Sequence, residues 1–227
     1  MGSFINNTAH SCGQHGSWFG NEYLPRKYPC RGISATNPVV ISELINYTAW
    51  ANKEEGFRVK LTVGINFINV KMADNFIAGI EVSKTPFGQG LNNITGGIFV
   101  GKSNNPSTRA SEKAIWLPRT EYFEVHGSHF YNFQTGAVFG TCSECILGCI
   151  ADSGARTSIH SNLYFDSTVN RRIIYDTRYN HIFSDLDGTL TGKGPNSWAT
   201  FTYKHNLRPE CEDNQAVYNG MVCNGDV

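Results

Sequence analysis

The stretch Val59-Lys-Leu-Thr-Val-Gly-Ile-Asn-Phe-Ile-Asn-Val-Lys-Met72 alternates apolar and polar residues and then changes phase. The apolar residues from Val59 to Phe67 share one parity, and those from Ile68 to Met72 share the other. Successive side chains of a strand point to opposite faces. A phase change without a break therefore predicts a strand that turns a corner and then presents the other parity to the interior.

The rest of the chain repeats this pattern in short bursts separated by Gly, Asn, Asp and Ser. Many short strands are compatible with a sandwich, a barrel, a propeller or a β-helix. We expect an all-β chain that forms a right-handed parallel β-helix, in which each coil is one repeat of the solenoid. The evidence is the even spread of the corners, the phase change and the many asparagines. Corner asparagines can stack and hydrogen-bond from coil to coil. A β-sandwich is the alternative, and one short helix is expected near residues 39–52, entered after Pro38.

Composition narrows the class of protein. The 227 residues allow one domain or one solenoid segment. Lys and Arg together number 19, as do Asp and Glu, so no basic field is present and nucleic acid is not expected as a partner. No apolar run approaches the ~20 residues of a membrane span.

Cysteines and glycosylation sequons indicate an extracellular or cell-surface location. Seven cysteines are many for a cytosolic protein of this size. Sequons begin at Asn6, Asn46 and Asn93, and we expect glycans there. The first residues lack the basic and apolar regions of a signal peptide. We therefore expect residues 1–227 to form a single β-helix segment, an internal piece of a larger extracellular protein.

Asp185-Leu-Asp187-Gly188-Thr189 matches the nucleophile motif of haloacid-dehalogenase-type phosphatases. In those enzymes the first Asp attacks phosphorus and the second transfers a proton. The reading is rejected because only about forty residues follow the motif, whereas each βαβ unit of such a domain takes ~30 residues.

Four segments together resemble the fibrocystin-like / cell-migration-inducing, hyaluronan-binding protein family. They are Asn7-Thr-Ala-His-Ser-Cys-Gly-Gln-His-Gly16 with Trp18-Phe19, Asn75-Phe-Ile-Ala-Gly-Ile-Glu81, Phe183-Ser-Asp-Leu-Asp-Gly-Thr-Leu-Thr-Gly192, and the tail from His205-Asn206 through Pro209-Glu-Cys211 to Asn219-Gly-Met-Val-Cys223. The third is the most specific, although Thr189 stands where the family usually has Ser. The segments span nearly the whole chain.

The resemblance implies a pectin-lyase-type β-helix in the extracellular part of a large protein. Some members of the family process hyaluronan and others are surface proteins with no accepted enzymatic role. We favour a non-enzymatic structural module, with a polysaccharide-depolymerising or glycan-binding β-helix as the alternative. Neither end of the sequence resembles a solenoid cap, so the expected partners are flanking domains or neighbouring protomers stacked on the coil ends, and glycans.

Asp185 and Asp187 are the leading candidate site residues. In a strand they would share one face, where they could bind a cation such as calcium, act as a glycosidase pair, or accept hydrogen bonds from the following corner. With Asp176 and Arg178 they form a candidate cation or glycan site. The other groove-lining candidates are Arg171, Arg172 and Tyr203. No catalytic residue is assigned, and the corner-stabilising role is favoured.

Histidines and cysteines supply the remaining candidates. His10 with His15, and His126 with His129, have the spacing of zinc half-sites, although histidines that hydrogen-bond a corner backbone explain them more simply. Short loop lengths predict disulfides between Cys12 and Cys30 and between Cys211 and Cys223. A third is expected within the Cys142, Cys145 and Cys149 trio, with Cys142 and Cys149 as the pair.

Overall fold

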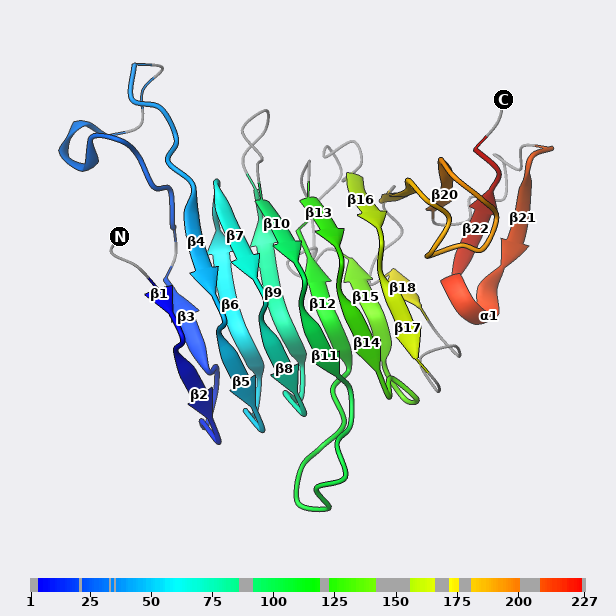
Figure 1. The fold of residues 1–227 in the computed structure, drawn as a ribbon, viewed down its shortest axis with the longest axis horizontal. Coiled ribbons are helices and arrows are strands. Elements are labelled where there is room, and N and C mark those ends of the chain that lie inside the picture. Colours follow the sequence, from blue (N-terminus) through cyan, green and yellow to red (C-terminus); the bar gives the residue numbers. More distant parts are fainter. Residues whose placement is uncertain are drawn as a thin grey trace.

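The computed structural model describes residues 4–20, 22–32, 34, 36–85, 92–118, 123–141, 156–165, 172–175, 181–200 and 209–225. Within them the chain winds repeatedly through three parallel sheets, and Figure 1 shows the coils stacked side by side along the long axis of the molecule. The predicted all-β parallel β-helix is confirmed.

Each coil places one strand in each sheet, in the same order. The first sheet takes β1 (Phe4–Ile5), β4 (Ser42–Ile45), β7 (Ile65–Ile68), β10 (Asn92–Thr95), β13 (Phe123–His126), β16 (Arg156–His160) and β19 (Ile182–Asp185). The second takes β2 (Thr8–His10), β5 (Thr48–Trp50), β8 (Lys71–Ala73), β11 (Ile98–Val100), β14 (His129–Tyr131) and β17 (Leu163–Phe165). The third takes β3 (Ser17–Phe19), β6 (Glu55–Leu61), β9 (Ala78–Lys84), β12 (Lys113–Leu117), β15 (Ala137–Thr141) and β18 (Ile173–Tyr175).

The phase change that predicted a corner coincides with one. Ile65 and Phe67 of β7 are buried, Asn69 adopts φ 52°, and burial resumes at Val70 and Met72. Ile68 is half-buried and precedes the corner, so the inward series restarts at Val70 rather than at Ile68.

The predicted helix near residues 39–52 is wrong. That segment forms β4 and β5, separated by Asn46 with φ 54°. β4 pairs with both β1 and β7, so ladder hydrogen bonds on two sides outweigh the weak local helix preference of the segment.

In each coil from β1 to β16, a residue with left-handed backbone conformation forms the corner that follows the strand of the first sheet. Asn6, Asn46, Asn69, Gly96, Gly127 and Ser161 occupy equivalent positions there, all with positive φ. Their amides extend the ladder, as in Asn46 N–H to the Ile68 carbonyl at 2.8 Å. The Asn46 side chain also donates to Asn6 Oδ1 at 3.0 Å, which confirms the expected asparagine contact between coils. Gly96 fits because a Cβ would lie 2.6 Å from Asn69 Oδ1.

Apolar residues of all three sheets fill the interior. Phe57, Phe67, Phe130 and Phe139 are fully enclosed. Rings in equivalent positions of successive coils stack, and the Phe99 and Phe130 centroids lie 5.2 Å apart. The core therefore continues from coil to coil along the solenoid axis.

Among the described residues, two excursions extend away from the coils. Residues 20–41 follow β3 and include the 3-10 helix η1 (Pro29–Arg31), and the buried Asn37 side chain ties this loop together through Tyr28 and Gly32. Residues 101–111 follow β11 and are anchored on the Asp74 carboxylate by Ser103 and Thr108.

At the C-terminal end of the solenoid the described residues add antiparallel strands to the first sheet, which the sequence did not predict. β20 (Ser197–Thr200), β22 (Gly220–Cys223) and β21 (Cys211–Asn214) extend the first sheet in antiparallel pairing, with the short helix α1 (Gln215–Tyr218) between β21 and β22. Leu190 is fully buried, and Tyr218 Oη donates to its carbonyl at 2.9 Å. Leu190 and Tyr218 of α1 thus cover part of the end of the core.

His181 gives the fold an acid sensitivity. It is buried beside Phe183, with Nε2 2.9 Å from Thr157 Oγ1, and burial lowers its pKa to about 3. Below pH ~6.5 the unfolded chain therefore binds a proton that the folded chain does not. The free energy of unfolding should fall by about 1.4 kcal/mol per pH unit from this group as the pH drops from ~6.5 towards 3.

Urea unfolding of the wild type and His181→Gln at several pH values checks this prediction. The variant should lose part of the acid dependence, whereas His10→Gln, at an exposed histidine, should retain it. Equal acid slopes in the wild type and His181→Gln would contradict it.

Candidate functional site

Asp185 ends β19 and is completely buried. Its carboxylate accepts hydrogen bonds from the amides of Gly188 at 3.1 Å and Thr191 at 2.7 Å. The Thr191 hydroxyl donates to it at 2.8 Å, and that of Ser197 lies 3.4 Å away. This carboxylate therefore holds together the loop that closes the solenoid.

Asp187 lies beyond the end of the strand and is exposed. It accepts from the Ser161 amide of the preceding coil at 2.6 Å and from the Thr189 hydroxyl at 2.7 Å. Partial burial alone would raise its pKa, but the hydrogen bonds from Thr189 and Ser161, together with the nearby His160, lower that pKa below its usual value. The expected shared face of Asp185 and Asp187 is wrong, because β19 ends at Asp185 and the backbone turns before Asp187.

The surroundings of these two carboxylates differ from those of a cation site. A hard cation needs oxygen ligands around it, whereas N–H and O–H donors from Gly188, Thr189, Thr191 and Ser161 point at Asp185 and Asp187. The arrangement fits a hydrogen-bonded corner better than a calcium site.

Of the other members of the C-terminal candidate set, only Arg172 belongs to the described residues. Arg171, Asp176, Arg178 and Tyr203 lie outside the described residues. Arg172 donates to the carbonyls of Thr189 and Leu190, so it supports the same closing loop.

One of the predicted disulfides is present in the described chain. Cys211 and Cys223 are bonded and lie directly opposite each other on β21 and β22. Cys12 and Cys30 carry free thiols, so their predicted pairing is wrong. Cys12 lies in the turn after β2, whereas Cys30 belongs to η1 in the excursion at the other end of the coil (Figure 1). Cys142, Cys145 and Cys149 lie outside the described residues.

The histidine pairs do not form zinc half-sites. His10 stacks on Trp50 at 4.4 Å, while His15 turns towards β6. His126 belongs to the first sheet, where it stacks on His160 at 4.8 Å, and His129 belongs to the second. The corner that separates the members of each pair sends them in different directions.

A cluster of titratable side chains lies at the third sheet and extends over three successive coils. His15 Nδ1 is 2.5 Å from Glu55 Oε2 and 3.3 Å from Glu54 Oε2. One coil further, Glu81 accepts from Ser83 Oγ at 2.6 Å and pairs with Arg58 at 3.3 Å. The side chains of Glu55 and Glu81 are both 1% exposed. We call His15, Glu54, Glu55, Arg58 and Glu81 the acidic cluster.

Burial and the neighbouring charges shift the pKa values of Glu55 and His15 in the acidic cluster. Burial, reinforced by the neighbouring Glu81 carboxylate, raises the pKa of Glu55 to about 8, although Arg58 opposes the shift. Burial also lowers the pKa of His15 despite the attraction of Glu54 and Glu81. Titratable groups perturbed by burial and by specific partners are typical of functional sites.

Glu54 and Glu55 were not predicted as site residues because they belong to none of the recognised segments, and Glu81 ends one of those segments without a role assigned to it. A signal was nevertheless available in the coil length. Positions 46 and 69 are both corner asparagines, and the same spacing places position 81 beside position 58, as the register of β6 and β9 shows. Aligning the coils on their corner asparagines would have brought Arg58 and Glu81 together.

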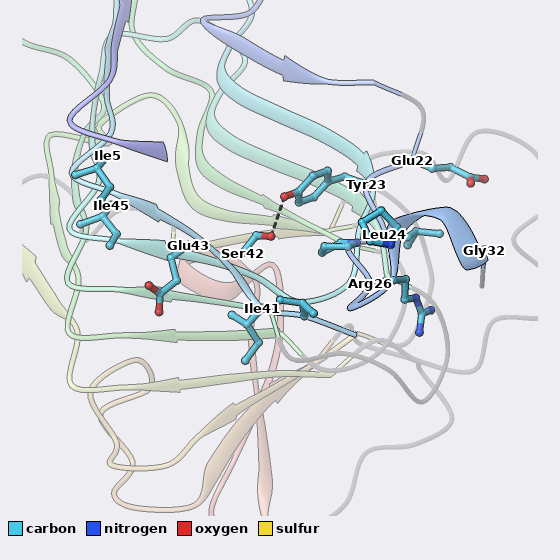
Figure 2. Close-up of a pocket in the computed structure, with 13 residues that line it drawn as sticks. Ile5, Glu22, Tyr23, Leu24, Arg26, Gly32, Ile41, Ser42, Glu43 and Ile45 are labelled. Atoms are coloured by element: carbon cyan, nitrogen blue, oxygen red, sulfur yellow. Dashed lines mark hydrogen bonds between the residues drawn. The ribbon is translucent and has the colours of Figure 1, made fainter. Parts of the chain in front are cut away.

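Figure 2 shows a separate hollow of about 590 Å³ between the 20–41 excursion and the start of the solenoid. Ile5, Ile41 and Ile45 give it an apolar wall, and Glu43 and Arg26 stand at its edge. Tyr23 Oη donates to Ser42 Oγ at 2.8 Å across it. The hollow contains none of the sequence-predicted site residues.

The three sequon asparagines occupy outer positions. Asn6 and Asn46 are exposed corner residues of adjacent coils. Asn93 is half-buried on the outer face of the first sheet, between Asn66 and Glu124 in register. All three remain predicted glycosylation sites.

The corner role of Asp185 can be tested by Asp185→Asn. The substitution turns an amide N–H towards N–H donors and should lower the free energy of unfolding by about 1–3 kcal/mol. Asp187→Asn should cost less because Asp187 is exposed, and Glu43→Gln, at another exposed carboxylate, serves as the control. Denaturant unfolding measures all three, and a smaller loss for Asp185→Asn than for Asp187→Asn would refute the assignment.

Comparison with known proteins found no family model that matches the chain. Human fibrocystin-L is 27% identical over 205 residues, which is 85% of this chain, and mouse fibrocystin-L is 28% identical over 206 residues. Dog fibrocystin is 24% identical over 230 residues, covering 99% of the chain. The chain spans about 5% of the length of these relatives. The resemblance to fibrocystin-like proteins is therefore confirmed over most of the chain.

Proposed function

We propose that the chain is a non-enzymatic, rigid β-helical rod segment of an extracellular protein. The observation that carries this proposal is the uninterrupted parallel stacking of β1, β4, β7, β10, β13, β16 and β19. With ~4.8 Å between neighbouring strands, the six steps from β1 to β19 extend about 29 Å along the axis. Such a segment separates whatever is attached at its two ends by a fixed length.

Stiffness follows from how the coils are joined. Each coil contacts its neighbours through three ladders and a continuous apolar core. Buried side-chain bonds add to these, as where Asn52 Nδ2 donates to Asn75 Oδ1 at 2.8 Å. Bending the rod would separate these contacts on one side, and close-packed interiors resist such deformation.

An extracellular setting is supported by independent features. The described residues include the Cys211–Cys223 disulfide, and disulfides persist in oxidising compartments. Three sequons lie at outer positions, and the similar proteins are fibrocystins. None of the helices in the described part of the chain has the length and apolar character that a membrane crossing needs.

A second candidate function is binding of a polysaccharide such as hyaluronan along the second sheet. One outward row of that sheet is in register across six strands, and it consists of His10, Trp50, Ala73, Val100, Tyr131 and Phe165. Tyr131 and Phe165 stack with centroids 4.6 Å apart, and Trp50 is 37% exposed. Such ring faces offer an apolar platform for sugar rings.

The rod proposal predicts a single fixed distance between outer positions of distant coils. Glu43 and Ser158 lie in one register row of the first sheet, four strands apart, which places their backbones about 19 Å apart. Spin labels can be introduced at both sites as unnatural amino acids, so that the native cysteines are not labelled. Pulsed electron paramagnetic resonance should then give one narrow distribution of label-to-label distances. A broad distribution in folded protein would contradict the rod.

Incubation of the same protein with hyaluronan of defined length tests the polysaccharide-depolymerising alternative. A rod leaves the polymer length unchanged. Shortening of the polymer by the wild type, abolished in a folded Asp187→Asn variant, would replace the rod proposal with the enzymatic alternative.

Glycosylation offers a test of the extracellular setting. When the chain is passed through a eukaryotic secretory pathway, we expect a glycan on Asn46, whose side chain is exposed and keeps one N–H for Asn6. Glycopeptide mass spectrometry checks this, and Thr48→Ala should abolish the modification while Thr8→Ala, at the Asn6 sequon, should leave it intact. A secreted, unmodified Asn46 would count against the prediction.

A further inference from the structure

The acidic cluster contains a set of converging metal-ligand atoms that the rod function does not use. His15 Nδ1 and one carboxylate oxygen each from Glu54 and Glu55 all lie within 4.8 Å of one another. His15 comes from the turn between β2 and β3, whereas Glu55 is the first residue of β6 in the next coil and Glu54 directly precedes it. The three donors therefore meet at the junction of two coils.

Backbone hydrogen bonds hold these two segments in place. The Gly16 amide donates to the Glu55 carbonyl at 2.9 Å, and the Glu54 amide donates to the Gln14 carbonyl at 3.2 Å. One residue earlier, the Lys53 amide donates to the Cys12 carbonyl at 3.1 Å. The two backbone segments that carry the ligand atoms are thus hydrogen-bonded to each other. This gives the rigid support that a metal site requires.

The charge arrangement also favours a cation. Glu54 and Glu55 are adjacent in sequence, and the side chain of Glu55 is 1% exposed. The Glu81 carboxylate lies beside Glu55 from the next coil and is held by Arg58 and Ser83. A buried carboxylate is costly unless it is paired with a cation or coordinates a metal. This contrasts with Asp185, whose oxygens are filled by amide and hydroxyl donors.

We propose that His15, Glu54 and Glu55 form a zinc site with an open fourth position. One imidazole nitrogen and two carboxylates suit Zn²⁺, which binds such atoms at ~2.0–2.2 Å and keeps one position open when three protein ligands are present. The 3.3 Å between His15 Nδ1 and Glu54 Oε2 matches the spacing of ligands around a tetrahedral ion, and the 2.5 Å to Glu55 Oε2 would have to widen. Ca²⁺ is disfavoured because it takes 6–8 oxygen ligands.

The exposure of Glu54 sets the path by which the ion enters. Its side chain is 32% exposed, whereas those of His15 and Glu55 are 9% and 1% exposed. Solvent therefore reaches the three ligand atoms from the side of Glu54. A bound ion would join the first coil to the second at the end opposite the cap formed by α1.

The test uses tag-free wild-type chain stripped of metal with a chelator and then titrated with ZnCl₂ by isothermal titration calorimetry. Zinc-edge X-ray absorption of the loaded protein should show nitrogen and oxygen ligands near ~2.0–2.1 Å at the saturating site. Zn²⁺ should also raise the melting temperature, and CaCl₂ should not.

Glu54→Gln is the main variant, because its partial exposure makes folding the expected outcome. Removing a first ligand should weaken Zn²⁺ binding by more than about tenfold, since even partners of a ligand commonly contribute that much. His15→Asn should do the same. His10→Asn is the matched control, because His10 lies five residues earlier and stacks on Trp50 outside the cluster.

The thiols need a control of their own, because cysteine sulfur also binds zinc. The titrations are repeated in a Cys12→Ser background with the remaining thiols alkylated, and binding there should persist. Three results would overturn the zinc site. The first is loss of binding in that background, and the second is a ligand shell that contains only sulfur near ~2.3 Å. The third is equal Zn²⁺ affinity in the wild type, His15→Asn and Glu54→Gln.

Discussion

Register between successive coils is the constraint on which the rest of this structure depends. A single coil of three short strands cannot bury its apolar side chains, so each coil is stabilised only by its neighbours. The left-handed corner residues keep the register because their amides continue the ladder through the turn, as Asn69 does with the Thr95 carbonyl at 2.8 Å. A one-residue slip would move every inward side chain to the outer face.

Stacking also decides the environment of each charged side chain. The buried carboxylates of Asp185 and Glu55 illustrate two different settings. Asp185 lies at the closing corner, where the amides of Gly188 and Thr191 surround it. Glu55 lies between His15 and Glu81, so it meets a titratable nitrogen and a second carboxylate instead. The same functional group is therefore a structural anchor in one coil and a member of a ligand-like set in another.

The C-terminal end shows how a parallel solenoid can stop. After β19 the first sheet changes to antiparallel pairing through β20, β22 and β21, and Leu190 with Tyr218 covers the core. The Cys211–Cys223 bond joins the two outermost of these strands. The closing loop is a structural element, because Asp185, Asp187 and Arg172 are explained by their hydrogen bonds to it and to the preceding coil.

The sequence by itself determined the all-β class, the coil-like organisation and the Cys211–Cys223 pair. These follow from local signals: the period of the apolar residues, left-handed asparagines at the corners, and a short loop between two cysteines. The helix expected near residues 39–52 failed because the local pattern does not reveal pairing on both sides of β4. Only the tertiary structure decided which outward residues meet, since that depends on the number of residues in each coil. For this reason His10 and His15, close in sequence, separate at a corner, whereas His15, Glu54 and Glu55 come together from adjacent coils.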